Sequence, residues 1–232
     1  MGDIEKREEI KRRIRSWLEN YHQLYLILIL VVAISLRLYY FILTKDQTLW
    51  WDEAEYMSIA KVFAYNIPYE ISPQRLVLFP LLASLFFKLG LEEISIKFFL
   101  VIIPSILVVF FTYLFVKKMY DKRIALLASF ITSLCWIHLF YSARVMNDEI
   151  GFLFGLLGLY LFWEGYISKE NTEINSKYIY LSSFFIALSF LIRPTGVLYA
   201  LILILFLFFT EQFKFLRKKE LWIMVLVFFL TI

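Results

Sequence analysis

Long apolar runs separated by short polar connections make up most of this 232-residue chain. A helix of about 20 apolar residues is long enough to cross the hydrocarbon core of a bilayer. The pattern therefore predicts an all-α, polytopic transmembrane helical bundle with about six full spans and a seventh that is cut short. The predicted spans are residues 24–43, 96–116, 124–142, 150–167, 178–192 and 197–210, followed by the incomplete run 221–232.

Composition supports a membrane protein and excludes several other classes. Hydrophobic residues make up 61% of the chain and aromatic residues 20%, more than a soluble domain of this length carries. The net charge is +4, and positive residues gather at segment ends, which indicates membrane orientation rather than nucleic-acid binding. The single cysteine, Cys135, excludes an intramolecular disulfide, and the chain has neither a glycine-rich phosphate loop nor Cys/His metal spacing.

Basic residues define the expected orientation of the spans. Residues 1–23 are rich in Lys and Arg and are predicted to form a cytoplasmic interfacial segment, ahead of a transmembrane domain over 24–232. The strongly basic connection 117–123 is also expected in the cytoplasm. If the connection 117–123 is cytoplasmic, the short apolar run 76–90 cannot cross the membrane. We therefore predict an interfacial or re-entrant helix there, within an external loop over 44–95.

The same orientation argument places one group of charged residues together on the external face. A carboxylate can take a proton from an attacking hydroxyl, and an arginine binds phosphate through its planar fork. Such a group suits a substrate that carries a phosphate and an acceptor that carries a hydroxyl. The group consists of Asp52, Glu53, Arg75, Arg144, Asp148, Glu149 and Arg193.

The densest acidic cluster follows two tryptophans, in the stretch from Trp50 to Tyr56. Tryptophan favours the membrane–water interface, so Asp52 and Glu53 are expected just outside the hydrocarbon, where neighbours can tune their basicity. The alternative is a helix cap, with Asp52 as N-cap and Glu55 at position N3 of a capping box. The cap does not require Glu53.

Other charged residues also have structural alternatives. Arg37 lies inside the first predicted span, where a cation is costly unless it faces a polar interior or snorkels to the interface. Arg144 could be a headgroup anchor, and Asn147 or Asp148 an N-cap of the next helix.

Four short motifs carry a resemblance to a known family. The motifs are the Asp52-Glu53 pair, the run Ser142 to Asp148, the run Leu191 to Gly196 and the run Leu36 to Tyr40. The first three occur in the order, and on the side of the membrane, that is expected of this family. Together they resemble the membrane glycosyltransferases of the protein O-mannosyltransferase and aminoarabinose-transferase superfamily. One departure is the stretch Ser72 to Arg75, where protein mannosyltransferases typically carry a His-Pro-Pro-type motif.

The resemblance implies a C-type fold, an external active site, a polyprenyl-phosphate sugar donor and inversion at the anomeric carbon. Asp52 would be the general base and Glu53 its support, so both are the catalytic candidates. The substrate-binding candidates are Arg37, Arg75, Arg144, Asp148, Glu149 and Arg193. The implied partners are the lipid-linked sugar, membrane lipid and an acceptor protein, glycan or lipid.

Three alternatives stay open at this point. No cofactor is required, but Asp52, Glu53 and Asp148 could hold a divalent cation that neutralises the phosphate. The chain could instead be a transporter or flippase of lipid-linked sugar, since Arg37 and the interruption at Pro194 are also transporter features. It could also be a non-catalytic remnant that binds the lipid-linked sugar without turnover, because we expect only the N-terminal part of a longer fold.

Overall fold

The structure is a computed structural model that describes residues 6, 8–9, 17, 20–69, 75–167 and 174–232. All regular structure within these ranges is helical, as the sequence predicts. The elements are α2 (His22–Thr44), α3 (Trp51–Tyr65), α4 (Leu78–Lys88), α5 (Glu93–Lys97), η1 (Phe98–Ile102), α6 (Ile103–Met119), α7 (Lys122–Leu134), α8 (Trp136–Ser142), α9 (Asp148–Phe162), η2 (Trp163–Ile167), α10 (Ser176–Ile192), η3 (Pro194–Gly196), α11 (Val197–Glu211), η4 (Gln212–Arg217) and α12 (Lys219–Thr231). Of the predicted cytoplasmic segment 1–23, the structure describes residues 6, 8–9, 17 and 20–23.

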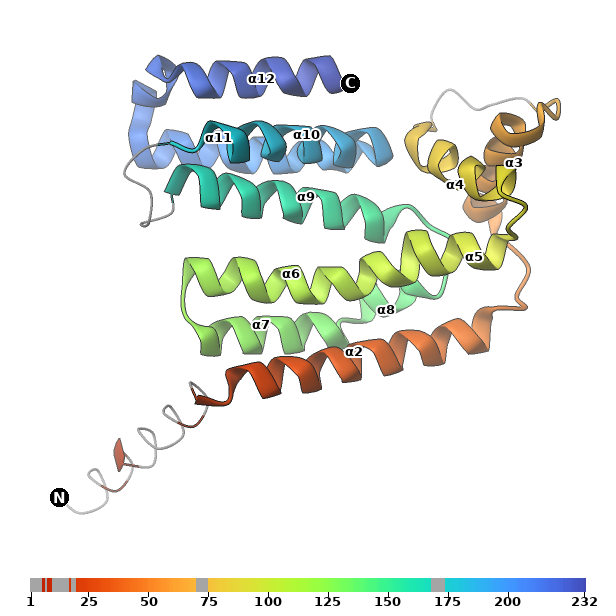
Figure 1. Cartoon of the computed structure of the whole chain (residues 1–232), viewed down its shortest axis with the longest axis horizontal. Helices are drawn as coiled ribbons and strands as arrows, with labels where there is room; N and C mark the ends of the chain where they lie inside the picture. Colours follow the sequence, from red (N-terminus) through yellow and green to blue (C-terminus); the bar gives the residue numbers. More distant parts are fainter. Residues whose placement is uncertain (1–5, 7, 10–16, 18–19, 70–74, 168–173) are drawn as a thin grey trace.

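The long helices lie side by side and alternate in direction along one bundle axis (Figure 1). Each of α2, the joined α5 and α6, the α7–α8 pair, α9, α10 and α11 runs along this axis. Helix α12 packs against α10 at one edge, and α3 and α4 pack on each other at one end of the bundle. We call this end, which also carries the connections 45–50, 143–147 and 193–196, the acidic end.

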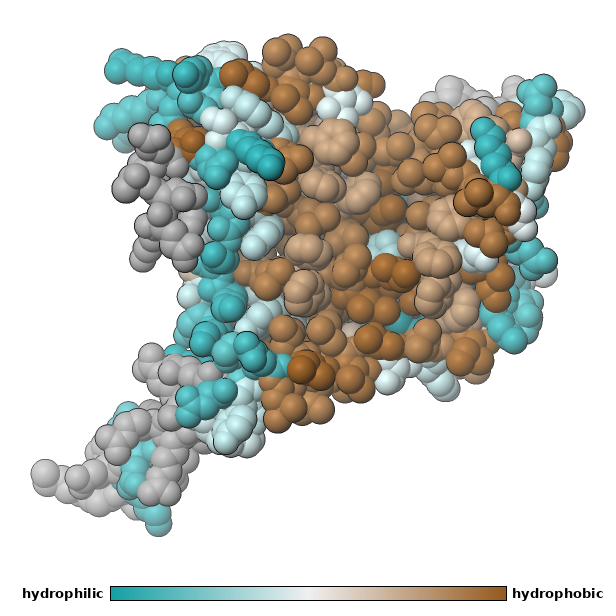
Figure 2. All heavy atoms as spheres, viewed as in Figure 1, coloured by the Kyte–Doolittle hydropathy of each residue, from teal (hydrophilic) through white to brown (hydrophobic). Residues whose placement is uncertain are grey.

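Apolar side chains cover the middle of the bundle and hydrophilic side chains gather at its two ends (Figure 2). Four helical segments among the described residues are long and apolar enough to cross a membrane: His22–Thr44, Glu93–Met119, Asp148–Ile167 and Pro194–Arg217. The bent pair Lys122–Leu134 and Trp136–Ser142 raises this to five if it forms one span. Helix α10, with 17 residues, is shorter than these segments, so the count of six spans and part of a seventh stays a prediction.

The basic connections lie at the end opposite the acidic end. The turn from α6 to α7, the turn from α11 to α12 and the start of α2 are all there (Figure 1). The run 76–90 contains the 11-residue helix α4, which packs on α3 and is too short to cross a bilayer. Its position at the membrane interface stays a prediction.

Glycines let α9 approach α10 closely, as small residues do between membrane helices. A Cβ on Gly158 would lie 2.4 Å from Ile186 Cγ1 and 3.1 Å from the Ser182 carbonyl oxygen. Hydroxyls then bond across the contact, since Ser182 Oγ donates to the Gly158 carbonyl and Ser189 Oγ to the Gly151 carbonyl, each at 2.7 Å. The α9–α10 contact therefore fixes the end of α10 beside the start of α9, where the site residues lie.

The start of α3 corrects the predicted capping register. The N-cap is Trp50, with extended backbone, and Glu53 occupies N3. Glu53 Oε2 accepts a hydrogen bond from the Trp50 backbone N–H at 2.5 Å. The predicted box with Asp52 as N-cap and Glu55 at N3 was wrong, because the helix begins two residues earlier and Asp52 lies within its first turn.

Candidate functional site

A pocket of about 170 Å³ at the acidic end brings four predicted site residues together. Asp52 comes from α3, Arg75 precedes α4, Asp148 begins α9 and Arg193 follows α10. We call it the central pocket. Its lining is Asp52, Tyr56, Arg75, Leu76, Met146, Asn147, Asp148, Ile192, Arg193 and Pro194.

Arg75 holds one side of the central pocket through two carboxylates. Its Nη2 donates to Asp52 Oδ1 at 2.5 Å, and its Nε donates to Glu55 Oε2 at 2.6 Å. These hydrogen bonds, to Asp52 first and then to Glu55, raise the pKa of Arg75 above its ordinary value, so the guanidinium stays charged. The side chain of Asp52 is still 43% exposed, which leaves this carboxylate accessible from solvent.

Tyr56 lies under the same guanidinium. The Arg75 Cζ is 5.3 Å from the centre of the Tyr56 ring, and Arg75 Nη1 is 3.5 Å from the Tyr56 hydroxyl oxygen. Burial raises the pKa of the Tyr56 phenol, so this group is a neutral donor at physiological pH.

Asp148 and Arg193 form an ion pair on the other side of the central pocket. The pair is positioned by its neighbour Asn147, whose Nδ2 donates to the Ile192 carbonyl at 2.7 Å and so joins the start of α9 to the end of α10. The Asp148 residue is only 8% exposed, and its second carboxylate oxygen, Oδ2, is buried without a hydrogen-bond partner among the described residues.

Glu53 does not line the central pocket. It is 3% exposed, and besides the Trp50 bond its Oε1 accepts a hydrogen bond from the Val145 backbone N–H at 2.5 Å. Arg144 approaches Glu53 Oε2 at 3.6 Å and stacks over the Trp50 ring at 4.8 Å. Glu53 therefore ties the start of α3 to the connection between α8 and α9.

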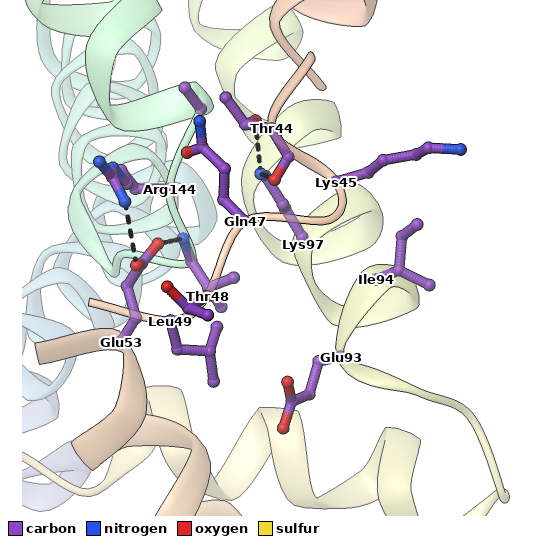
Figure 3. A pocket seen from close by; sticks show the side chains of 12 residues that line it. Thr44, Lys45, Gln47, Thr48, Leu49, Glu53, Glu93, Ile94, Lys97 and Arg144 are labelled. Atoms are coloured by element: carbon purple, nitrogen blue, oxygen red, sulfur yellow. Dashed lines mark hydrogen bonds and ion pairs between the residues drawn. The ribbon is translucent and has the colours of Figure 1, made fainter. Parts of the chain in front are cut away.

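Glu53 and Arg144 line a second pocket, of about 60 Å³, together with Lys97 (Figure 3). Lys97 is 5% exposed, and its ammonium donates to the Thr44 hydroxyl at 2.7 Å and the Thr44 carbonyl at 3.2 Å. We call this the Lys97 pocket. Its lining carries three cations, Lys45, Lys97 and Arg144, and two carboxylates, Glu53 and Glu93, of which Glu93 pairs with Lys61 outside the lining.

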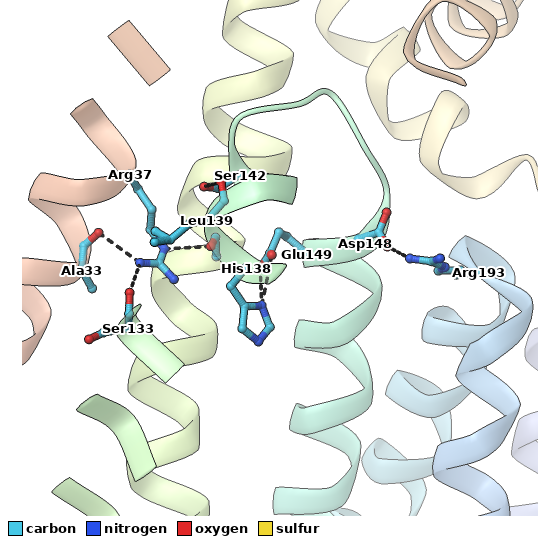
Figure 4. Close-up of polar contacts among 10 residues, drawn as sticks. Ala33, Arg37, Ser133, His138, Leu139, Ser142, Asp148, Glu149 and Arg193 are labelled. Carbon is cyan, nitrogen blue, oxygen red and sulfur yellow. Dashed lines mark hydrogen bonds and ion pairs between the residues drawn. The ribbon is translucent and has the colours of Figure 1, made fainter. Parts of the chain in front are cut away.

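Glu149 lines a third pocket, and its side chain faces His138 (Figure 4). The Glu149 carboxylate oxygens lie 3.1 and 3.3 Å from His138 Nδ1. We call this the lateral pocket. It has a volume of about 110 Å³ and is lined by Ile137, His138, Asp148, Glu149, Gly151, Phe152, Ser189, Arg193, Thr195 and Tyr199.

Comparison with protein-family models matches residues 74–232 to the family described as dolichyl-phosphate-mannose-protein mannosyltransferase. The chain belongs to this family. Membership indicates a multi-pass membrane glycosyltransferase and supports the resemblance drawn from the motifs. The matched range includes Arg75, Arg144, Asp148, Glu149 and Arg193, whereas Asp52 and Glu53 precede it. No curated protein and no solved structure matches the chain.

Arg37 of this mannosyltransferase-family chain lies apart from the three pockets. It is fully buried, and its Nε donates to Ser105 Oγ at 2.8 Å. Its Nη1 donates to the carbonyls of Ala33 at 3.2 Å and Ser133 at 3.1 Å. The Ser133 carbonyl lies where α7 stops before a 49° bend into α8, so Arg37 satisfies a backbone acceptor that the break exposes.

The carboxylates considered as a divalent-cation site have separate partners. Asp52 bonds Arg75, Asp148 pairs with Arg193, and Glu53 accepts backbone N–H groups in the Lys97 pocket. Across the described residues, no three His, Cys, Asp or Glu side chains are grouped so that they could hold a metal ion.

Three residues of the site were missed from the sequence. Tyr56, Lys97 and His138 line the pockets but are not among the candidates named from the sequence. A buried Lys flanked by apolar residues is a signal that could have been used, because such a cation needs a polar partner. No signal in the sequence joins His138 to Glu149.

Proposed function

We propose that this chain is an inverting glycosyltransferase that moves a hexose-type sugar from a polyprenyl-phosphate donor to an acceptor hydroxyl. Family membership indicates a membrane glycosyltransferase. The proposal adds the class of donor, the stereochemistry of the transfer and the roles of individual residues. The acceptor is a hydroxyl of a protein, a glycan or a lipid.

The observation that carries the proposal is the composition of the central pocket. Four segments that are far apart in the sequence bring two carboxylates and two guanidiniums to one pocket of about 170 Å³. Arginines that bind the leaving phosphate more tightly as its charge develops lower the barrier to transfer. A carboxylate in the same pocket can accept the proton of the attacking hydroxyl.

The geometry supports Asp52 as the base. Of the two acidic side chains of the central pocket, Asp52 is the more exposed, and only its Oδ1 bonds Arg75. In a single displacement, the acceptor oxygen bonds to the anomeric carbon as the bond from that carbon to the phosphate oxygen breaks. The acceptor proton passes to Asp52, and the bonding electrons leave with the phosphate.

Two groups of cations are candidates for the phosphate. Arg193 has a side chain 38% exposed and lines both the central and the lateral pockets, so it can exchange its contact with Asp148 for a phosphate. Arg144 and Lys97 form the second group, in the Lys97 pocket. Glu53 supports the site by holding Arg144 and the start of α3 in place.

The side of the membrane follows from charge. Basic connections at one end of the bundle favour the cytoplasm, which would put the acidic end on the external face, or in the lumen of an endomembrane system. The N-terminus would then be cytoplasmic.

The test is the transfer of labelled mannose from polyprenyl-phosphate mannose to membrane acceptors, measured in membranes that carry the chain. Asp52→Asn should lower the rate by about 10²- to 10⁴-fold, which is the usual contribution of a general base. Donor binding by the purified variant should stay within about threefold of wild type, since Asn keeps the shape of the side chain. The matched control is Asp46→Asn, whose side chain is 88% exposed outside the pockets.

Other outcomes separate the alternatives. Donor binding by wild type without any transfer would favour a non-catalytic binding role. Movement of the lipid-linked sugar across sealed vesicles, unaffected by Asp52→Asn, would favour a transporter. Equal rates in Asp52→Asn and wild type would remove Asp52 from the role of base.

A further inference from the structure

The connection from α11 to α12 gathers basic residues at the end of the bundle opposite the acidic end (Figure 1). We call residues 211–222 the basic turn. Its two acidic residues are Glu211 and Glu220. Four cations against two carboxylates give the basic turn a net charge of +2. The four cations are Lys214, Arg217, Lys218 and Lys219.

Contacts within the protein use one of these cations. The Lys218 ammonium donates to Glu211 Oε1 at 2.7 Å and to the Tyr166 hydroxyl at 2.8 Å. The Tyr166 hydroxyl in turn donates to the same Glu211 oxygen at 2.9 Å. The other three cations are exposed and make no ion pair or side-chain hydrogen bond with the part of the chain that the structure describes. Glu211 is therefore compensated internally, and three cations remain available to an anion.

Hydrogen bonds also define the shape of the basic turn. The Trp222 indole N–H donates to the Leu216 carbonyl at 2.8 Å. The Lys218 backbone N–H donates to the Phe215 carbonyl at 3.1 Å. The contact of Lys218 with Tyr166 then joins the turn to η2. The three available cations are thus carried by a backbone that is already organised, so less freedom is lost when an anion binds.

Apolar side chains lie between the cations along the basic turn. Phe213 is 69% exposed, Leu216 46% and Trp222 58%. At this end of the bundle, hydrophilic side chains border the apolar band (Figure 2). Aromatic rings next to Lys and Arg suit the boundary of a bilayer, where rings enter the apolar layer and charges stay among the headgroups. A soluble acidic partner would not supply that apolar layer, so the surface favours lipid.

We propose that the basic turn binds the headgroups of anionic phospholipids through Lys214, Arg217 and Lys219. A cluster of basic residues directly beside a membrane-spanning helix attracts anionic lipid, and the candidate span Pro194–Arg217 ends in this cluster. Arg217 can bind a headgroup phosphate through its planar fork, and the two lysines add compact positive charges. Donor binding is not required for this interaction, since none of the three cations lines a pocket of the acidic end.

The test compares two lipids that differ in the charge of the headgroup. Phosphatidylglycerol and phosphatidylcholine with the same acyl chains are titrated into the purified full chain in neutral detergent, and bound lipid is counted by native mass spectrometry. The quantity measured is the ratio of the two affinities. We expect wild type to bind phosphatidylglycerol about tenfold tighter or more, since each cation near a membrane surface contributes about fivefold. The triple variant Lys214→Gln, Arg217→Gln, Lys219→Gln should lower this ratio by about tenfold.

Two matched variants show whether charge at this position is the cause. The triple variant Lys214→Arg, Arg217→Lys, Lys219→Arg keeps the charge and should keep the ratio. Lys88→Gln removes an exposed lysine at the last position of α4, outside the basic turn, and should also leave the ratio unchanged. Added salt should lower the ratio of wild type, because it screens exposed charges.

Several outcomes would overturn the proposal. Equal affinity of wild type for the two lipids would do so, and so would a ratio that the triple Gln variant retains. A loss of equal size in Lys88→Gln would assign the preference to the net charge of the chain and not to the basic turn. Tighter binding of a poly-glutamate peptide than of phosphatidylglycerol, abolished by the triple Gln variant, would assign the turn to an acidic protein partner instead.

Discussion

Asp52 and Glu53 are neighbours in sequence, yet they lie in very different surroundings. Glu53 is 3% exposed and accepts backbone hydrogen bonds on both oxygens, from Trp50 and Val145. The side chain of Asp52 is 43% exposed and shares Arg75 with Glu55. A carboxylate whose oxygens are both taken by backbone groups holds chain segments together. An accessible one with a single partner keeps an oxygen open to a ligand.

The comparison predicts a large effect of Glu53 on stability. Glu53→Ala leaves two backbone N–H groups without an acceptor and Arg144 without its carboxylate, so the free energy of unfolding should fall by about 3 kcal/mol. Chemical denaturation in detergent micelles measures this. Asp52→Ala is the control, with a loss below about 1 kcal/mol, since Asp52 is an accessible ion-pair partner. Equal losses of unfolding free energy in the two variants would show that Glu53 and Asp52 do not differ in their structural role.

Arg37 extends the comparison to a buried cation. Arg37→Met keeps much of the side-chain volume but leaves the Ser133 carbonyl and the Ser105 hydroxyl without their donor, so we expect a loss of about 2 kcal/mol in unfolding free energy. Transfer activity per folded molecule should stay near wild type, because Arg37 lines none of the three pockets. Loss of donor binding with unchanged stability would instead restore Arg37 as a substrate-binding residue.

Asp121 is intermediate between Asp52 and Glu53, since it is accessible but accepts backbone hydrogen bonds. As N-cap of α7, its Oδ1 accepts from the Ile124 N–H at 2.9 Å and the Arg123 N–H at 2.8 Å. Asp121→Ala should lower the unfolding free energy by about 1 kcal/mol, the usual effect of losing a cap. Asp121→Asn should retain most of the stability that the cap contributes.

The same cap gives a pH dependence whose sign is fixed. The hydrogen bond from the Ile124 N–H and the further bond from Arg123 lower the pKa of Asp121 in the folded protein below its unfolded value. The stability that the Asp121 carboxylate contributes is therefore fully present above its pKa in the unfolded state. It is lost as the pH falls through its pKa in the folded state. The difference in unfolding free energy between wild type and Asp121→Asn should shrink on acidification, and a difference that grows would contradict the assignment.

Much of the fold could be predicted because membrane burial imposes simple rules. The long apolar runs predicted the helical segments His22–Thr44, Glu93–Met119 and Asp148–Ile167 to within three residues at each end. The span count was less predictable. Cys135 adopts an extended backbone and breaks the run 124–142, a choice of local conformation that hydropathy does not report.

The candidate site was predicted in part. Orientation by charge brought Asp52, Arg75, Asp148 and Arg193 to one end, and the structure places them around one pocket. It separates from them Glu53, which has a clamping role, and Arg37, which lies deep between α2, α6 and α7. The roles of these candidates in catalysis and substrate binding stay predictions.

The sequence alone determined the class of protein, the helices and the end of the bundle at which the charged residues gather. These properties follow from hydropathy and charge, which act through the environment of each segment and not through particular neighbours. Only the tertiary structure decided which charged groups pair, which oxygen of Asp148 has no partner, and that His138 faces Glu149. Those facts depend on contacts of a few ångströms between segments far apart in the chain, because a hydrogen bond requires a short donor–acceptor distance and a defined direction, and an ion pair strengthens as its charges approach.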